Sequence, residues 1–185
     1  MQNKSPQNIE VELRGLMSEE KYNQIIIFLS KKASHTTDDS KISYFFVVPH
    51  GILKISNQSI NNTAKISYKD GNVSQNILME YEIQISPDDT EKGISMFKSL
   101  GFKNVNEVRQ NRINFKYKRA EIAIKITPDF GPHFEIEMMA RDKADAVKKR
   151  IRIQMLCNEL GLKPLTGRQM DKLVYSINKK HGFLS

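Results

Sequence analysis

Several short segments of this chain alternate strictly between charged and apolar residues, so that the charges stand at every second position. The first of them, residues 9–14, reads Ile-Glu-Val-Glu-Leu-Arg. Such alternation is typical of a β-strand, whose successive side chains point to opposite faces. Residues 65–69, 80–83 and 134–138 follow the same rule. Each of these strands therefore has one ionic face and one apolar face, and the fold has to provide a place for both.

The ionic faces differ in sign along the chain. Carboxylates gather on the first and last of these strands, and cations on the strands between them. The carboxylates are Glu10, Glu12, Glu135 and Glu137, and the cations are Lys54, Lys65, Lys69, Arg112 and Lys116. A solvated surface would mix the signs, as half-exposed strands usually do. We therefore expect these faces to line an enclosed, wet tunnel with an acidic cluster beside a basic one.

The remaining pattern predicts an α+β fold. Strands are predicted at residues 42–48, 52–56, 63–69, 77–85, 105–118, 121–126 and 134–139. Two helices interrupt them, at residues 18–33 and 89–100, and the polar segment 34–40 is expected to be a loop. Short connections favour antiparallel pairing. The prediction is an eight-stranded antiparallel β-barrel, forming a tunnel, with helices packed outside.

The length favours one domain over residues 1–185, with the barrel at about 8–139. Two C-terminal helices are expected within about 142–179, at residues 142–160 and 167–179. The chain carries 29 Lys and Arg against 21 Asp and Glu, a net charge of +8, which indicates an anionic partner. No apolar run reaches membrane-spanning length, so no membrane association is expected. The polar N-terminus and the lone Cys157 favour a cytoplasmic protein without disulfides.

The two kinds of ionic group suggest a chemistry. Clustered carboxylates repel one another unless a hard cation lies between them, and Mg²⁺ or Mn²⁺ prefers such oxygen ligands. Lys and Arg neutralise the oxygens of a polyanion. Carboxylate-held metal together with cations is the set of groups that phosphoryl transfer requires.

These residues also resemble a known family. The sequence Glu10-x-Glu12-x-Arg14 is similar to the ExExK signature of the CYTH, or triphosphate tunnel metalloenzyme, superfamily, which includes class IV adenylate cyclases, thiamine triphosphatases and tripolyphosphatases. Further similar motifs follow in the family's order. They are Leu53-Lys54-Ile55-Ser56 for LRxR, Ser67-Tyr68-Lys69 with Gly71 for TxK-G, Glu80-Tyr81-Glu82 for ExE, Leu100-Gly101-Phe102 for LGF, Gln110-Asn111-Arg112 for KxR, and residues 131–137 for GxFxEIE.

The resemblance implies a role for each matching residue. Glu10 and Glu12 would be catalytic, as metal ligands or by positioning water. Glu135 and Glu137 would complete a site for Mg²⁺ or Mn²⁺. The phosphates would be bound by Arg14, Lys54, Lys69 and Arg112, with Lys65 as a further candidate, and Glu80 and Glu82 would orient these groups.

Besides Arg14, which replaces the Lys of ExExK and keeps the charge, the chain departs from the family pattern at three positions. Ser56 stands where the second Arg of LRxR is usual, and Gln110 where the Lys of KxR is usual. Lys125 stands where many members carry an Asp, which should weaken metal binding or shift the substrate. Lys65 and Lys116 are candidates to replace the missing cations, and Asp129 to replace the missing carboxylate.

Three functions remain open at this stage. The first is a metal-dependent hydrolase of inorganic tripolyphosphate, thiamine triphosphate or a nucleoside triphosphate. The second is a class IV-type adenylate cyclase, and the third is a protein that binds a triphosphate without turnover. The expected partner is a small molecule with a triphosphate group. No nucleic acid is expected beyond a 5′-triphosphate end, and a homodimer stays open.

Overall fold

The computed structural model describes residues 9–48, 51–58, 61–70, 77–102 and 105–182. One sheet contains all the strands of these residues. The strands are β1 (Ile9–Leu16), β2 (His35–Asp38), β3 (Lys41–Phe46), β4 (Ile52–Gln58), β5 (Thr63–Asp70), β6 (Ile77–Ile85), β7 (Val105–Tyr117), β8 (Ala120–Thr127) and β9 (Gly131–Ala140). The helices are α1 (Glu19–Lys32), α2 (Thr90–Ser99), α3 (Lys143–Leu160) and α4 (Gly167–Lys180), with a short 3₁₀ turn, η2 (Pro87–Asp89), before α2.

The sheet closes into an antiparallel barrel. Its order is β2-β7-β3-β4-β5-β6-β1-β9-β8, and β8 pairs with β7 to close it. β2 and β3 lie one after the other along the same edge of β7, because β2 pairs with residues 113–116 and β3 with residues 105–110. They share one position around the ring, so the described strands form the predicted eight-stranded barrel.

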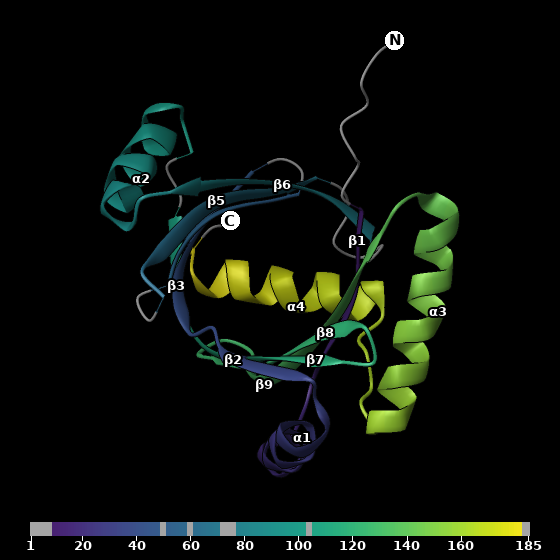
Figure 1. Ribbon diagram of the computed structural model, residues 1–185. Coiled ribbons are helices and arrows are strands. Elements are labelled where there is room, and N and C mark those ends of the chain that lie inside the picture. Colours follow the sequence, from purple (N-terminus) through teal and green to yellow (C-terminus); the bar gives the residue numbers. More distant parts are fainter. Residues whose placement is uncertain (1–8, 49–50, 59–60, 71–76, 103–104, 183–185) are drawn as a thin grey trace.

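The apolar faces of the strands point outward, and helices cover most of them, although Tyr81 and Ile83 on β6 stay exposed. One core packs α1 and α3 against β1, β8 and β9, and contains Val11, Leu29, Ile136 and Ile153, all fully buried. A second core packs α2 against β3, β4 and β5 around Ile55. Figure 1, which looks down the barrel, shows α1, α2 and α3 placed around its outside. This arrangement leaves the interior to the ionic faces.

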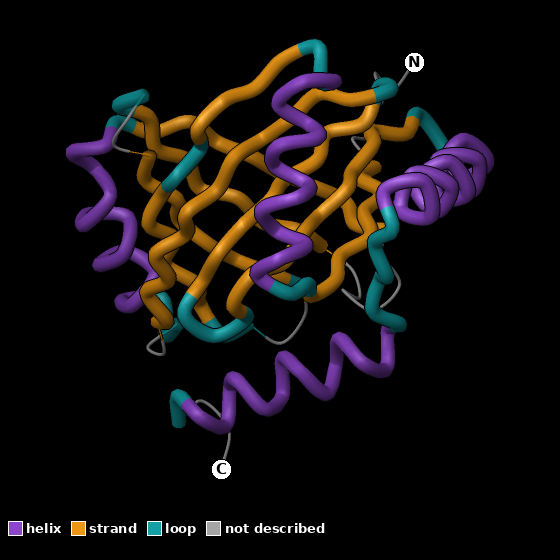
Figure 2. The backbone as a smooth tube through the Cα atoms, turned by 90° about the horizontal axis from the view of Figure 1, so that it is seen from below, coloured by secondary structure: helices purple, strands orange, loops and turns teal. Residues whose placement is uncertain are grey.

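The predicted helices are confirmed, and local capping explains most of their ends. Ser18 accepts a hydrogen bond from the Lys21 amide and begins α1, and Asp142 begins α3 in the same way. Gly161 ends α3 in the left-handed conformation that glycine favours. α4 begins with a capping box at Thr166. Figure 2 shows α4 lying across one end of the barrel. None of the described helices is long and apolar enough to cross a membrane.

One secondary-structure prediction is wrong. The segment expected to be a loop, residues 34–40, contains β2, whose side chains are all exposed. Backbone hydrogen bonds to the edge of β7 hold this strand, and no side chain of it is buried. Its sequence, His-Thr-Thr-Asp, therefore shows no alternation of apolar and polar residues. Gly71 of the TxK-G motif falls outside the described residues.

Gly15 lies where β1 approaches the segment after α3. A Cβ at this position would be 2.4 Å from the Lys163 carbonyl oxygen and 2.7 Å from the Phe134 ring. We expect Gly15→Ala to lower the free energy of unfolding by about 1–3 kcal/mol, because backbone and ring must both move. Urea denaturation measures the change.

The matched control is Gly93→Ala, on α2. Its new methyl group would lie 2.9 Å from the terminal Cδ1 of Ile55 and near no backbone atom of the described residues outside α2, and alanine favours the helix. This variant should lose less stability than Gly15→Ala, because one side-chain end rather than backbone has to move. A Gly15→Ala protein of unchanged stability would mean that the Lys163 backbone and the Phe134 ring can move apart without loss of stability.

Candidate functional site

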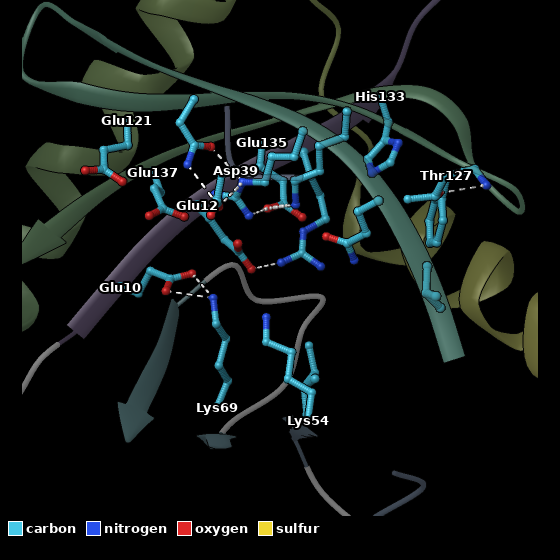
Figure 3. Close-up of a pocket in the computed structure, with 18 of the residues that line it drawn as sticks. Glu10, Glu12, Asp39, Lys54, Lys69, Glu121, Thr127, His133, Glu135 and Glu137 are labelled. Carbon is cyan, nitrogen blue, oxygen red and sulfur yellow. Dashed lines mark hydrogen bonds and ion pairs between the residues drawn. The ribbon is translucent and has the colours of Figure 1, made fainter. Parts of the chain in front are cut away.

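The barrel encloses a cavity of about 1130 Å³. Every site residue predicted from the sequence lines it, from Glu10, Glu12 and Arg14 on β1 to Glu135 and Glu137 on β9. The others are Lys54, Lys65, Lys69, Glu80, Glu82 and Arg112. Figure 3 shows carboxylates and cations from different strands pointing toward one another across this space. The prediction of an inward-facing ionic parity is confirmed.

Three carboxylates form a cluster at one side of the cavity. Glu10, Glu12 and Glu137 each place an oxygen within 4.8 Å of the others'. The register makes this contact unavoidable, because Glu12 on β1 lies directly opposite Glu137 on β9. Like charges placed directly opposite one another in a sheet are unfavourable. Burial and the neighbouring Glu10 raise the pKa of Glu137, as expected for carboxylates crowded together.

Glu12 is the most enclosed member of this cluster. It is fully buried, and its Oε1 accepts a hydrogen bond from Arg14. Its Oε2 is buried and has no hydrogen-bond partner among the described residues. A buried carboxylate oxygen without a partner costs free energy unless a ligand satisfies it. This oxygen is therefore a position at which a cation fits.

Lys69 holds the first carboxylate of the cluster. Its Nζ donates to Glu10 at 2.5 and 2.7 Å and lies 3.6 Å from Glu80. Burial alone would raise the pKa of Glu10, but the Lys69 ammonium and a hydrogen bond with Glu80 together lower it. Glu80 is more weakly paired, so burial and the nearby Glu10 raise its pKa to about 7. Lys69 thus lies between the acidic cluster and Glu80.

Glu135 is separate from this cluster, although the sequence grouped it with the metal ligands. The Lys125 ammonium donates to its Oε2, and Arg112 Nη1 lies 4.0 Å from the same oxygen. Burial opposes the ionised form of Glu135, but Lys125, Arg14 and Arg112 hold its pKa well below the usual range. The structure therefore divides the four predicted carboxylates into three and one.

Lys54 differs from the other predicted phosphate-binding cations. Arg14, Lys65, Lys69 and Arg112 each form an ion pair with a carboxylate. Lys54 forms none among the described residues, and its Nζ lies 5.9 Å from the centre of the Phe45 ring. Burial and the neighbouring Lys69 and Lys41 lower its pKa to about 7. An unpaired cation in a partly enclosed cavity is a position at which an anion fits.

Sequence reasoning missed several groups in the cavity. Lys41 lies directly opposite Gln110 in the sheet, and its Nζ lies 2.9 Å from Asp39, which also contacts Arg112 at 3.2 Å. His133 is nearly buried, and its Nδ1 lies 2.8 Å from the Gly131 carbonyl oxygen. Lys41 stands one residue before the predicted strand, so extending the alternation by one position would have found it.

Two candidate replacements lie away from the acidic cluster. Lys116 lines the cavity, but its side chain is 60% exposed, and its Nζ lies 3.8 Å from Glu121. Asp129 instead binds the end of α4, with Lys180 Nζ at 2.9 Å and His181 Nε2 at 2.8 Å. Asp129 therefore fastens the helix that crosses the end of the barrel.

The residues present fit a divalent cation. Three carboxylates provide oxygen donors of the kind Mg²⁺ and Mn²⁺ prefer, and one buried oxygen has no other partner. Cations surround this group, so a bound metal would sit beside sites for phosphate oxygens. The arrangement can bind a polyanion and a metal ion together.

The chain matches one family model. The CYTH domain model matches residues 8–169, which is most of the chain. Among curated proteins, none matches the sequence significantly.

Solved structures with the same fold come from organisms that are only distantly related to one another. The PH1819 protein of Pyrococcus horikoshii OT3 superposes with a TM-score of 0.72 at 20% identity, covering 90% of this chain and 98% of its own. A putative adenylate cyclase from Vibrio parahaemolyticus has a TM-score of 0.69 at 14% identity, covering 91% and 99%. HpAC1 from Hippeastrum, a putative adenylyl cyclase with a dominant triphosphatase activity, has a TM-score of 0.58 at 17% identity, covering 85% and 89%. At these identities the likeness shows the fold.

The unpaired Lys54 should make stability depend on pH. Its pKa is about 7 in the folded protein and 10.5 when unperturbed, so the unfolded chain binds more protons between these values. Stability therefore rises with pH across this window, and below pH 7 the ammonium destabilises the fold fully. We expect Lys54→Met to raise the free energy of unfolding at pH 6.5 by up to about 4 kcal/mol, with the gain shrinking as the pH rises toward 10.5.

Urea denaturation at pH 6.5 and pH 9.5, without added anions, tests this expectation. Lys98→Met on the exposed face of α2 removes the same charge outside the cavity and serves as the control. A Lys54→Met protein less stable than the wild type at pH 6.5 would contradict an uncompensated ammonium.

Proposed function

The chain belongs to the CYTH domain family, and we propose that it is a divalent-metal-dependent hydrolase of a linear triphosphate bound in its tunnel. Candidate substrates are inorganic tripolyphosphate, thiamine triphosphate and nucleoside triphosphates. The observation that carries the proposal is that, in the part of the chain that the structure describes, one cavity contains both a carboxylate oxygen without a hydrogen-bond partner and a lysine without a carboxylate partner. Glu12 has a buried oxygen without a partner, and Lys54 is a cation without an ion pair among the described residues.

Each side of the cavity has its own part in the proposal. Glu10, Glu12 and Glu137 would hold Mg²⁺ or Mn²⁺. A bound divalent ion supplies Lewis-acid stabilisation of the phosphate oxygens and lowers the pKa of a coordinated water. Glu10 and Glu12 would in addition orient the attacking water. The cations that would bind the phosphates are Arg14, Lys54, Lys65, Lys69 and Arg112.

Apart from Lys54, the proposed phosphate-binding cations are held in place by ion pairs before any ligand binds. Glu82 pairs with Lys65, and Glu80 lies beside Lys69. Arg112 donates from Nε to Asn114 Oδ1 at 2.6 Å. Such positioning matters because phosphoryl transfer depends mainly on placement and charge stabilisation. The dominant triphosphatase activity of HpAC1 from Hippeastrum supports this reaction over cyclisation.

A second candidate function is triphosphate binding without turnover. Its support is that the cavity departs from the family pattern. Ser56 and Gln110 carry no charge where the pattern has cations, and Lys125 forms an ion pair with Glu135. Cyclisation of ATP is the third candidate, and its support is the likeness to proteins described as putative adenylate cyclases. The proposal also includes a cytoplasmic location, and a 5′-triphosphate end as the one form of nucleic acid that the tunnel would admit.

Phosphate release from tripolyphosphate, thiamine triphosphate and ATP, each with Mg²⁺, Mn²⁺ or a chelator, tests the reaction. We expect metal-dependent release from at least one substrate. Glu12→Gln should lower kcat by at least roughly 100-fold, because even the partners of metal ligands commonly contribute 10- to 100-fold. Glu107→Gln removes an exposed carboxylate on β7 and should leave the rate unchanged.

The outcomes separate the three candidates. Cyclic AMP and pyrophosphate from ATP would establish cyclisation. Salt-dependent binding of tripolyphosphate in calorimetry, without release from any substrate, would establish a binding protein. Equal phosphate release by the wild type and Glu12→Gln would mean that the activity comes from a contaminant or another site.

A further inference from the structure

The fourth interior carboxylate is neutralised by the protein itself. Glu135 stands on the same face of β9 as Glu137, two residues away, yet it is not part of the three-carboxylate cluster. Lys125 on β8 is 5% exposed and donates to Glu135 Oε2. Arg112 contacts the same oxygen from β7. The negative charge of Glu135 is therefore already matched before any ligand enters.

The strand register explains this division. Glu137 lies directly opposite Glu12 on β1 and Glu121 on β8, so carboxylates flank it on both sides. Glu135 lies opposite Arg14 on β1 and Ala123 on β8. The small Ala123 leaves room for Lys125, two residues along β8, to reach the carboxylate. Two carboxylates on the same face of one strand thus have opposite electrostatic surroundings.

We propose that Lys125 is a built-in cation that limits this cavity to one divalent metal ion per chain. The ion would be held by Glu10, Glu12 and Glu137, where the buried Glu12 Oε2 has no partner among the described residues. A second ion at Glu135 would have to displace an enclosed ammonium and would be repelled by Arg112 and Arg14. This inference rests on the metal site of the proposed function and adds the number of ions and the residue that sets it.

Counting bound Mn²⁺ tests the inference without any substrate. The loss of the free Mn²⁺ signal in electron paramagnetic resonance gives the stoichiometry of the full-length protein. We expect one tightly bound Mn²⁺ in the wild type and in Lys125→Arg, which keeps the positive charge. Lys125→Met removes the ammonium that pairs with Glu135 and should bind a second Mn²⁺, more weakly than the first because Arg14 and Arg112 stay beside Glu135. Glu12→Gln should weaken the single wild-type site at least roughly 10-fold.

A double variant keeps the test valid if Lys125→Met alone does not fold. Lys125→Met with Glu135→Gln removes both charges of the pair, so the interior stays balanced, and circular dichroism checks its fold. It should bind one Mn²⁺ with an affinity within about threefold of the wild type, because Glu135 is not a ligand. Two Mn²⁺ in the wild type, one in a folded Lys125→Met, or a loss of binding in the double variant would each overturn the inference.

This experiment is separate from the test of catalysis. A wild type that binds one Mn²⁺ and releases no phosphate would refute the hydrolase and leave the role of Lys125 standing. Metal-dependent phosphate release with two Mn²⁺ per wild-type chain would do the reverse.

Discussion

The structure depends on matching charges inside a closed barrel. Removing an ion from water costs several kcal/mol even after relaxation, and a buried pair offsets this cost only with good geometry. The interior of this barrel meets that condition mainly through contacts between strands. Lys69 on β5 reaches Glu10 on β1, and Lys125 on β8 reaches Glu135 on β9. Because the ionic faces point inside, the apolar faces lie outside, where α1, α2 and α3 cover most of them.

The same constraint explains why the fold could be predicted from the sequence. Strands that alternate charged and apolar residues, with carboxylates and cations on different strands, are best accommodated around an enclosed ionic cavity. The short turns between the strands favour antiparallel pairing. The alternation therefore placed Glu10, Glu12 and Lys69 correctly on the inside. It could not reveal β2, because that strand is held by backbone hydrogen bonds along an edge, which leave no periodic trace in the side chains.

The alternation also could not predict the contacts within the cavity. It indicates on which face of the sheet a side chain lies, whereas the strand register decides which side chains of the neighbouring strands it contacts. Glu135 and Glu137 are equivalent in the sequence, two carboxylates on one parity of one strand. In the sheet, one lies opposite Arg14 and the other opposite Glu12. The grouping of four carboxylates into one metal site was therefore beyond what the sequence pattern could resolve.

Register also bears on the interior positions that depart from the family pattern. Ser56 lies directly opposite Lys65, and Gln110 lies directly opposite Lys41. Residues directly opposite each other share a face of the sheet, with Cβ atoms about 4.5–5.5 Å apart. A long lysine side chain can thus carry its ammonium to the region that a cation at the neighbouring position would occupy. Lys65 on β5 and Lys41 on β3 line the cavity beside the two uncharged positions on β4 and β7. A motif describes one strand at a time, whereas a polyanion interacts with the surface that adjacent strands make together.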